Sequence, residues 1–293
     1  MIHRWRLTQS KMINVPYRLA RAEGGLVRSL YARMIPKIVS QPLAQSKRIR
    51  ASVFSFSCET LLPEQTASIL SFIRHVGVPE KFIVASDGTY SEGSISVLRR
   101  IHDCVQVVDW MEIAVDVPDC VRAFAKRNPM GKKLALLISL PVDNATIYTD
   151  CDMLFFPNSR DLTRIIESGD EGHWYLPDCF TALDTSFLRD ESEKLNPVNA
   201  GFMVLKRRLD WSEQLDRLAA YEAPGWATEQ TIVHLAMHRN HAQPLSPDRF
   251  ILRVEDQFIY RDLYASREIA LRHYVNNVRH KFWQSISLRT FHN

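Results

Sequence analysis

Two aspartates separated by one residue are the strongest chemical signal in the sequence. Asp150 and Asp152 follow the apolar run 145–149, which has the pattern of a β-strand, and precede a second apolar run, 153–156. Two carboxylates this close repel each other unless a cation lies between them, and their hard oxygen atoms favour Mg²⁺ or Mn²⁺. Because ligands of open α/β sheets bind outside the carboxyl ends of strands, the pair predicts a divalent-metal site for a phosphorylated ligand. Acidic residues of a solvated turn are the alternative, since Asp-x-Asp is common by chance.

Two further positions near predicted strand ends carry polar groups that suit a nucleotide. Asp87 follows the predicted strand 82–85 and precedes Gly88, so its carboxylate can accept hydrogen bonds from a base or ribose, or can form a turn. Lys132 and Lys133 open a helical pattern just before the aspartate pair. One of them, assigned as Lys132, is expected to meet a phosphate or sugar. The other is expected to be a solvated surface charge, because lysines are rarely buried unpaired.

Two short polar stretches in the second half of the chain suit a sugar. Asn199 can donate to and accept from hydroxyl groups, and Gly201, which lacks a Cβ, lets the backbone approach a sugar ring closely. An ordinary turn before a strand explains the same residues. Glu229 and Gln230 follow Thr228 at the start of a predicted helix, where helix capping is the alternative to a role in a site.

An α/β fold is expected to position these residues. From residue 51 short β-rich runs alternate with helical patterns, which is typical of a parallel sheet covered by helices. After the aspartate pair the pattern becomes mixed, and no internal repeat is present. The expected strands are 53–56, 82–85, 105–108, 145–149, 174–176 and 202–205. The expected helices are 63–75, 94–101, 131–140, 211–220 and 228–238.

Taken in order, these stretches resemble the nucleotide-sugar-dependent glycosyltransferases of the GT-A fold, and among them the bacterial family 8-like enzymes. The resemblance covers about residues 51–284. It includes 273–283, which is similar to the family's closing His…Lys-x-Trp segment, although the gap from His273 to Lys281 is longer and Phe282 stands where a proline is usual. It rests on Val84-Ala-Ser-Asp87-Gly88, Gly131-Lys-Lys-Leu134, Tyr148-Thr-Asp150-Cys-Asp152, Pro197-Val-Asn199-Ala-Gly201 and Thr228-Glu229-Gln230.

The resemblance implies an α/β fold of the GT-A type, with a Rossmann-like nucleotide-binding half that has a mixed central sheet and with an acceptor-binding half. It also implies a metal-dependent hexosyltransferase. The donor would be a nucleoside diphosphate sugar, with a UDP-sugar favoured, and the acceptor a glycan or glycolipid in bacterial surface-polysaccharide or lipopolysaccharide assembly. Mn²⁺ or Mg²⁺ would be bound by Asp150, Asp152 and His273, with His280 as the competing third ligand. Lys281 would stabilise the charge that develops on the departing diphosphate. Donor binding is also implied for Asp87, Lys132, Asn199 and Gly201, beside the two aspartates.

The same resemblance favours retention of the donor's anomeric configuration. Gln230, with Glu229 beside it, would then lie near the anomeric carbon and stabilise positive charge there, while the departing phosphate takes the acceptor's proton. In this reading Asp178 only orients sugar hydroxyl groups. In an inverting enzyme Asp178 would instead be the base that deprotonates the acceptor.

Two other functions fit parts of the sequence. A haloacid dehalogenase-like phosphatase also places its nucleophile in a strand-end Asp-x-Asp. Here Met153 and Leu154 stand where that family has a small hydroxyl or glycine pair, and no convincing downstream acidic motif follows. A noncatalytic protein could keep a GT-A-like fold and bind partners through a basic N-terminus, although the donor-site residues that are present argue against this.

The N-terminal segment 1–50 is strongly basic. It carries eleven Lys and Arg residues against the single acid Glu23, whereas residues 51–293 carry 26 basic and 32 acidic residues. Apolar residues at helical spacing over 26–38, interrupted by Pro36, predict an amphipathic helix. Such a helix either packs on its own domain or binds an anionic membrane surface, and we do not expect nucleic acid as a partner. We therefore divide the chain into a basic arm, 1–50, a single GT-A domain, 51–284, and a tail, 285–293.

The overall composition is that of a globular chain. Its 293 residues are 46% hydrophobic and 24% charged, which suffices for a large core. No run approaches the roughly 20 apolar residues that cross a bilayer, and residues 1–10 lack the apolar stretch of a secretory signal. The five cysteines are widely spread, so neither a disulfide framework nor a zinc site is expected. We expect a cytoplasmic protein, or one on the cytoplasmic face of a membrane.

Overall fold

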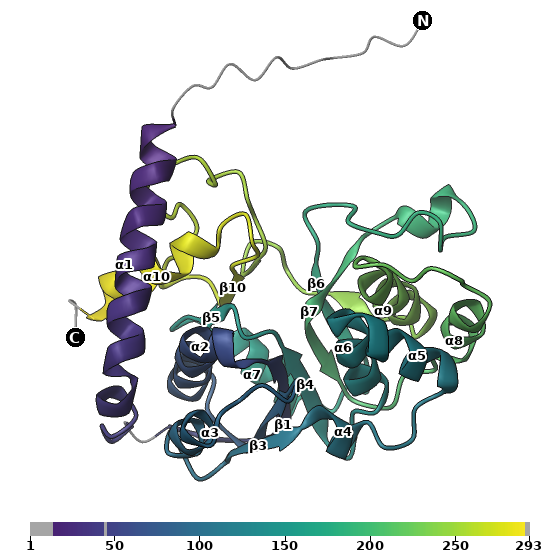
Figure 1. Ribbon diagram of the computed structural model, residues 1–293, viewed down its shortest axis with the longest axis horizontal. Coiled ribbons are helices and arrows are strands. Elements are labelled where there is room, and N and C mark those ends of the chain that lie inside the picture. Colours follow the sequence, from purple (N-terminus) through teal and green to yellow (C-terminus); the bar gives the residue numbers. More distant parts are fainter. Residues whose placement is uncertain (1–13, 44–45, 291–293) are drawn as a thin grey trace, which may run out of the picture.

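A seven-stranded mixed sheet forms the centre of the structure (Figure 1). The computed structural model describes residues 14–43 and 46–290 of the chain. Its strands are β1 (Arg48–Ser57), β2 (Val78–Ser86), β3 (Val105–Asp109), β4 (Ala145–Thr149), β5 (Met153–Phe155), β6 (Trp174–Pro177), β7 (Val198–Leu205), β8 (Gln243–Pro244), β9 (Phe250–Ile251) and β10 (Leu271–His273). Its helices are α1 (Val15–Ile38), α2 (Leu62–His75), α3 (Glu92–Arg99), α4 (Trp110–Ile113), α5 (Asp119–Arg127), α6 (Pro129–Ile138), α7 (Arg160–Glu167), α8 (Ser212–Ala219), α9 (Thr228–Arg239) and α10 (Arg279–Thr290), with 3₁₀ turns η1 (Glu59–Leu61) and η2 (Glu191–Lys194).

The strands of the central sheet follow the order β3-β2-β1-β4-β7-β6-β8. The first four are parallel, as expected where strands and helices alternate along the chain. β7 is antiparallel to both of its neighbours, β4 and β6, and this reversal accounts for the irregular pattern of the second half of the sequence. The prediction of an α/β fold with a mixed central sheet is confirmed.

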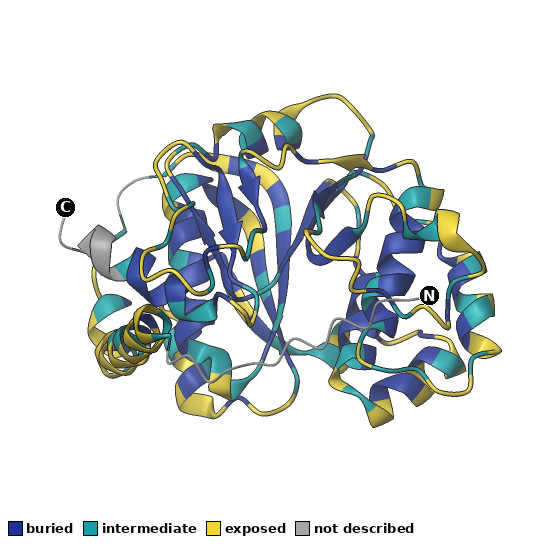
Figure 2. Cartoon of the chain, turned by 90° about the horizontal axis from the view of Figure 1, so that it is seen from above, coloured by how far each residue is buried: buried dark blue, intermediate teal, exposed yellow. Residues whose placement is uncertain are grey.

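Two hydrophobic cores cover the two faces of this sheet. Neighbouring residues of a strand point to opposite faces, so Val53 and Ile147 belong to one core while Phe54 and Tyr148 belong to the other. Helices α2, α3 and α7 cover the first face, and α5, α6 and α9 cover the second (Figure 1). β4 and β7 are buried along their whole length, which agrees with their mostly apolar sequences. Figure 2 shows the buried strands between helices whose outer sides are exposed.

A second, three-stranded sheet has the order β5-β10-β9. The short link 150–152 connects β4 of the central sheet directly to β5 of this one. β10 runs antiparallel to β5, with His273 opposite Met153, and the Tyr274 N–H donates to the carbonyl oxygen of Asp152 at 2.9 Å. This pairing brings the end of β10 beside the aspartate pair.

The long helix α1 packs against α10 and α2 (Figure 1). α1 and α10 cross closely at Gly24, because a Cβ there would lie 2.5 Å from the carbonyl oxygen of His280. Arg28 forms an ion pair with the buried Glu64 of α2, with Nε 2.6 Å from Oε1. Glu64 also accepts a hydrogen bond from the Trp283 indole of α10 at 3.2 Å. The three helices are therefore joined by a shared polar contact as well as by apolar packing.

The apolar stripe predicted over 26–38 divides between two sides of α1. Pro36 lies in the last turn, and the helix ends at Ile38. The inward side, which packs on the domain, includes Val27, Tyr31 and Ile35. The outward side includes Leu26, Leu30 and Met34, which are exposed. Packing on the domain thus uses only half of the stripe.

The outer limits of the GT-A domain remain predictions. β1 begins at Arg48 and α10 continues to Thr290, so the limits placed at residues 50 and 284 fall inside these two elements. None of the helices in the described ranges combines the length and the apolar character needed to cross a membrane.

Candidate metal centre and donor site

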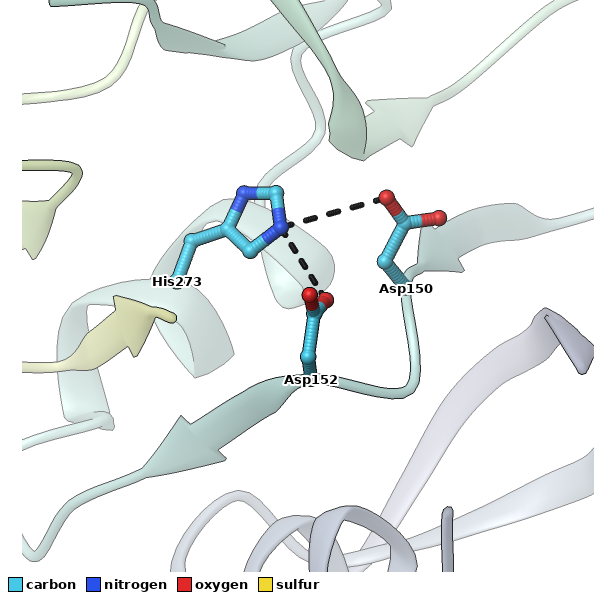
Figure 3. Close-up of side chains that lie close together, drawn as sticks. All are labelled: Asp150, Asp152 and His273. Atoms are coloured by element: carbon cyan, nitrogen blue, oxygen red, sulfur yellow. Dashed lines mark hydrogen bonds and ion pairs between the residues drawn. The ribbon is translucent and has the colours of Figure 1, made fainter. Parts of the chain in front are cut away.

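Asp150, Asp152 and His273 form a cluster at the junction of the two sheets (Figure 3). One ligand atom from each residue lies within 4.8 Å of the others. His273 Nε2 is 3.1 Å from Asp152 Oδ1 and 3.9 Å from Asp150 Oδ2. Asp152 and His273 are buried, whereas Asp150 is partly exposed, so the cluster is accessible from the Asp150 side. Among the residues that the structure describes, no other group of three His, Cys, Asp or Glu side chains is arranged in this way.

Asn199 fixes the orientation of the His273 ring. Its Oδ1 lies 3.0 Å from His273 Nδ1 and also accepts a hydrogen bond from the Gly201 N–H at 2.9 Å. Because an amide oxygen can only accept, Nδ1 carries a proton, and in the neutral ring Nε2 presents a lone pair to the carboxylates. Without a cation, Nε2 can instead carry a second proton and donate to Asp152 Oδ1, so the ring can serve either as a metal ligand or as a partner of that carboxylate. One imidazole nitrogen and two carboxylates are a donor set that can hold a divalent cation.

Gly201 lies against this cluster, where a side chain has no room. A Cβ at this position would lie 2.5 Å from His273 Cε1 and 2.9 Å from Asp150 Oδ2. The carbonyl oxygen of Gly201 accepts a hydrogen bond from the Asp150 N–H at 2.8 Å. Close approach is therefore required at this glycine, and the groups that approach it are two of the candidate metal ligands, His273 and Asp150, together with Asn199 Oδ1 at 2.7 Å.

The carboxylate of Asp152 contacts two nitrogen-bearing side chains. Oδ1 faces His273, and Oδ2 accepts a hydrogen bond from the guanidinium of Arg279, the first residue of α10. Burial raises the pKa of Asp152, but His273 and Arg279 together outweigh burial and hold this pKa below its usual range. Sequence reasoning missed Arg279. A usable signal was present, because Arg279 is a basic residue that lies between two predicted site residues, His273 and Lys281.

Lys133 links Asp150 to Glu229. Its Nζ is 3.1 Å from the Asp150 carboxylate and 3.6 Å from Glu229 Oε1, and the residue is only 7% exposed. The Tyr148 hydroxyl donates to Asp150 Oδ1 at 2.8 Å. Burial raises the pKa of Glu229 to about 7, although Lys133 opposes the shift. The prediction that the lysine beside Lys132 is a solvated surface charge is wrong, because Lys133 is a buried partner of Asp150.

Gln230, Asp178 and Asn199 form a hydrogen-bonded group that is continuous with the cluster. Asp178 Oδ2 accepts from Gln230 Nε2 at 3.0 Å and from Asn199 Nδ2 at 3.1 Å, while Asn199 also contacts His273. The structure thus joins most of the predicted site residues in one polar network, namely Asp150, Asp152, Asp178, Asn199, Gly201, Glu229, Gln230 and His273.

Asp87, which follows β2, and Lys132 of α6 contact each other, and within the described ranges neither side chain is hydrogen-bonded to this network. Lys132 Nζ donates to the carbonyl oxygen of Asp87 at 3.0 Å. Asp87 Oδ1 accepts from the N–H and the hydroxyl of Thr89 at 3.0 and 2.6 Å. The turn, which is the alternative interpretation of Asp87, is therefore present. A turn and a nucleotide contact are compatible, because Asp87 keeps a second carboxylate oxygen.

Lys281 and His280 face away from the aspartate pair. Lys281 is fully buried, and its Nζ donates to the carbonyl oxygens of residues 259, 260 and 261 at 2.6, 3.2 and 2.9 Å. The His280 ring packs edge-on against Tyr17 of α1, with 5.4 Å between ring centroids. The structure therefore brings His273, and not His280, to the aspartates, and it also brings Arg279 to Asp152.

Comparison with known proteins gives a likeness in structure only. No family model matches the sequence, and no curated protein matches it. Mouse xyloside xylosyltransferase 1 superposes with a TM-score of 0.53 at 14% identity, over 79% of this chain and 99% of that chain. Galactosyltransferase LgtC, solved with donor and acceptor sugar analogues, superposes with a TM-score of 0.51 at 13% identity, over 81% of this chain and 95% of that chain. Glycosyltransferase GlyE of Streptococcus pneumoniae TIGR4 superposes with a TM-score of 0.55 at 14% identity, over 84% of this chain and 63% of that chain.

The likeness of these three structures to this chain extends over about four-fifths of its length. At such low identity the likeness defines the fold. In this chain the Asp-x-Asp pair follows β4 at the carboxyl end of the parallel strands, where sheets of this class bind their ligands. The chain therefore has the GT-A glycosyltransferase fold.

Proposed function

We propose that this chain is a metal-dependent glycosyltransferase that moves a sugar from a nucleoside diphosphate sugar to a glycan or glycolipid acceptor. The observation that carries the proposal is the cluster of Asp150, Asp152 and His273 at the carboxyl end of β4 in a GT-A fold. Two carboxylates and an imidazole nitrogen converge there and are accessible from one side. The fold favours this function over the phosphatase alternative.

Cleavage of the donor's glycosidic bond leaves negative charge on the diphosphate. Mn²⁺ or Mg²⁺ held by Asp150, Asp152 and His273 would neutralise part of that charge. Arg279 supplies another positive charge beside Asp152, and its planar guanidinium can donate two parallel hydrogen bonds to a phosphate. We assign to Arg279 the phosphate-binding role expected of Lys281, because the Lys281 ammonium is engaged by three backbone carbonyls.

For the sugar, we propose transfer with retention of configuration from a UDP-sugar. Asp178 holds the side-chain amides of Gln230 and Asn199, so the three groups form a rigid polar surface that can orient hydroxyl groups. Gln230 would lie near the anomeric carbon, with Glu229 next to it at the start of α9. The departing phosphate would take the acceptor's proton on the same face, so that no protein carboxylate is needed as a base.

The first product formed from an α-linked UDP-sugar is therefore expected to carry an α linkage. Proton NMR of the early product distinguishes the two anomers directly. Asp178→Asn, which preserves the shape of the side chain, is expected to leave part of the activity, because Asp178 only orients neighbouring groups in this mechanism. A β linkage together with loss of transfer in Asp178→Asn would overturn the assignment and make Asp178 the base.

Binding of a nucleoside diphosphate is expected to depend on the cation. A ligand present at about 100 times its Kd stabilises the native state by about 2.7 kcal/mol, so UDP with Mn²⁺ should raise the melting temperature clearly. The rise should be much smaller in excess EDTA or in Arg279→Met. Differential scanning fluorimetry with UDP, GDP and ADP measures this, with exposed Arg100→Met as the matched control. An equal rise with and without Mn²⁺ would count against the metal, and no rise with any nucleotide would favour the noncatalytic alternative.

We further propose that the reaction belongs to bacterial surface-polysaccharide or lipopolysaccharide assembly and takes place at the cytoplasmic face of a membrane. The family resemblance implies the first part. The basic, exposed side of α1 supports the second.

A further inference from the structure

The outward side of α1 is an apolar surface that no other described element covers. Its residues recur every four positions, with one interval of seven, so they share one side of the helix. This side lies opposite Ala20, Gly24 and Ile35, which are buried against the domain. Its apolar members are Val15, Leu19, Leu26, Leu30 and Met34, whose exposed fractions are 53, 56, 62, 47 and 48%.

The loop between β9 and β10 extends this surface. Phe258 packs edge-on against Tyr17 with 5.4 Å between ring centroids, and Tyr260 lines a shallow groove together with Leu19 and Leu26. The hydrogen bonds from Lys281 to the carbonyls of 259–261 fix this loop on α10. In Figure 1 the loops before β10 stand beside the upper half of α1. We call the combined surface the α1 patch; it comprises Val15, Leu19, Leu26, Leu30, Met34, Phe258, Ile259 and Tyr260, all of them exposed.

Basic residues surround the α1 patch. Arg18, Arg21, Arg33 and Lys37 are exposed on α1, and Glu23 is the only acidic residue of this helix. Neither Arg18 nor Arg33 has an ion-pair partner within the described ranges. Figure 2, which looks along α1, shows that most of the helix surface is exposed. The patch therefore combines leucine side chains, aromatic side chains and uncompensated positive charge.

We propose that the α1 patch binds an anionic lipid bilayer, with α1 lying parallel to the membrane surface. An interfacial helix needs this combination, because its apolar side enters the boundary of the acyl chains while flanking Arg and Lys contact lipid phosphates. Tyr and Phe at the loop tips suit the headgroup region, where an aromatic ring can be partly buried. Charge complementarity favours an anionic surface over a second copy of this chain, which would bring two basic helices together. The proposal goes beyond sugar transfer, since membrane binding requires neither donor nor acceptor.

Vesicle flotation of the full chain tests the proposal. The chain is expected to float with vesicles of equal parts phosphatidylcholine and phosphatidylglycerol, much less with phosphatidylcholine alone, and less as salt is raised. The double variant Arg18→Gln, Arg33→Gln should weaken partitioning about 25-fold, because each basic residue near such a surface contributes roughly a factor of five. Leu19→Ser, Leu26→Ser and Leu30→Ser together should weaken it at least about tenfold. The matched control is Val115→Ser with Leu195→Ser, two exposed apolar positions away from α1 that should change nothing.

Several outcomes would overturn the proposal. These are no flotation, equal flotation with neutral vesicles, and undiminished flotation of the serine variant. Analytical sedimentation tests the alternative occupant, a second copy of this chain. If the unaltered chain is a dimer, the serine variant is a monomer and neither floats with vesicles, the patch binds a second copy. If the serine variant fails to fold, the arginine pair decides, because Arg18 and Arg33 are exposed. UDP-dependent thermal shifts of the same variants should be unchanged, which separates this proposal from the proposed sugar transfer.

Discussion

Replacing Asp152 with Asn is expected to lower the rate of sugar transfer by at least about a thousandfold. Both oxygens of Asp152 are committed, one to His273 Nε2 and the other to Arg279, and the side chain is only 6% exposed. Asn keeps the shape but has no negative charge, so one ligand of the cation and the partner of Arg279 are lost together. Removing a single group that stabilises developing charge typically costs a hundredfold to a thousandfold, and here a ligand and an ion pair are lost at once.

A transfer assay over a Mn²⁺ titration measures this effect. Asp116→Asn, at an exposed position, is the matched control and should behave as the unaltered chain. Thermal unfolding without metal should show that the Asp152 variant remains folded. Wild-type rates in Asp152→Asn, or undiminished transfer by the unaltered chain in excess EDTA, would refute the metal site.

Replacing Arg272 with Met is expected to lower the free energy of unfolding by about 3–5 kcal/mol. Arg272 is completely buried and forms ion pairs with two buried carboxylates of the preceding loop, Asp256 at 2.9 Å and Asp262. Its guanidinium carbon also lies 5.0 and 4.8 Å from the ring centroids of Tyr264 and Tyr274. Met fills a similar volume but leaves two buried negative charges uncompensated, and that cost is far larger than the loss of a surface pair.

Urea unfolding followed by circular dichroism measures the difference. The matched control is Arg164→Met, which removes the same group from the ion pair with Asp161, where the Arg164 side chain is 79% exposed. That change should cost no more than about 1 kcal/mol. A similarly small loss in Arg272→Met would contradict the prediction. It would show that Asp256 and Asp262 become protonated or form other hydrogen bonds when the guanidinium is removed.

The strands that lead to the aspartate pair could be predicted because each is at least four residues long and apolar. The second sheet could not, since β5 and β10 have three residues each, too few for an alternating pattern to be recognised. Yet these two strands place His273 beside Asp152. The sequence alone therefore predicts the carboxylate ligands, whereas the histidine was expected only from the family resemblance.

The identity of the basic residues in the site was hard to predict for a different reason. A lysine or arginine side chain is long, and its partner is selected by tertiary contacts that spacing along the chain does not reveal. The Lys281 ammonium donates to three carbonyls of a loop about twenty residues earlier in the chain, and these hydrogen bonds hold it away from the aspartates. Arg279 contacts Asp152 instead. Lys133 is buried only because Asp150 and Glu229 lie on either side of it.

Asp152 and His273 lie 121 residues apart in the chain. His273 is the last residue of β10, and Asp152 directly precedes β5, the strand that pairs with β10. A cation held by both would act on the folding equilibrium as a disulfide does, by closing a long loop. For a loop of this length the chain-entropy treatment of cross-links gives about 4–5 kcal/mol. Metal affinity and the stability of the second sheet are then two measures of one equilibrium, so a substitution that loosens β10 weakens the metal site even when it touches no ligand.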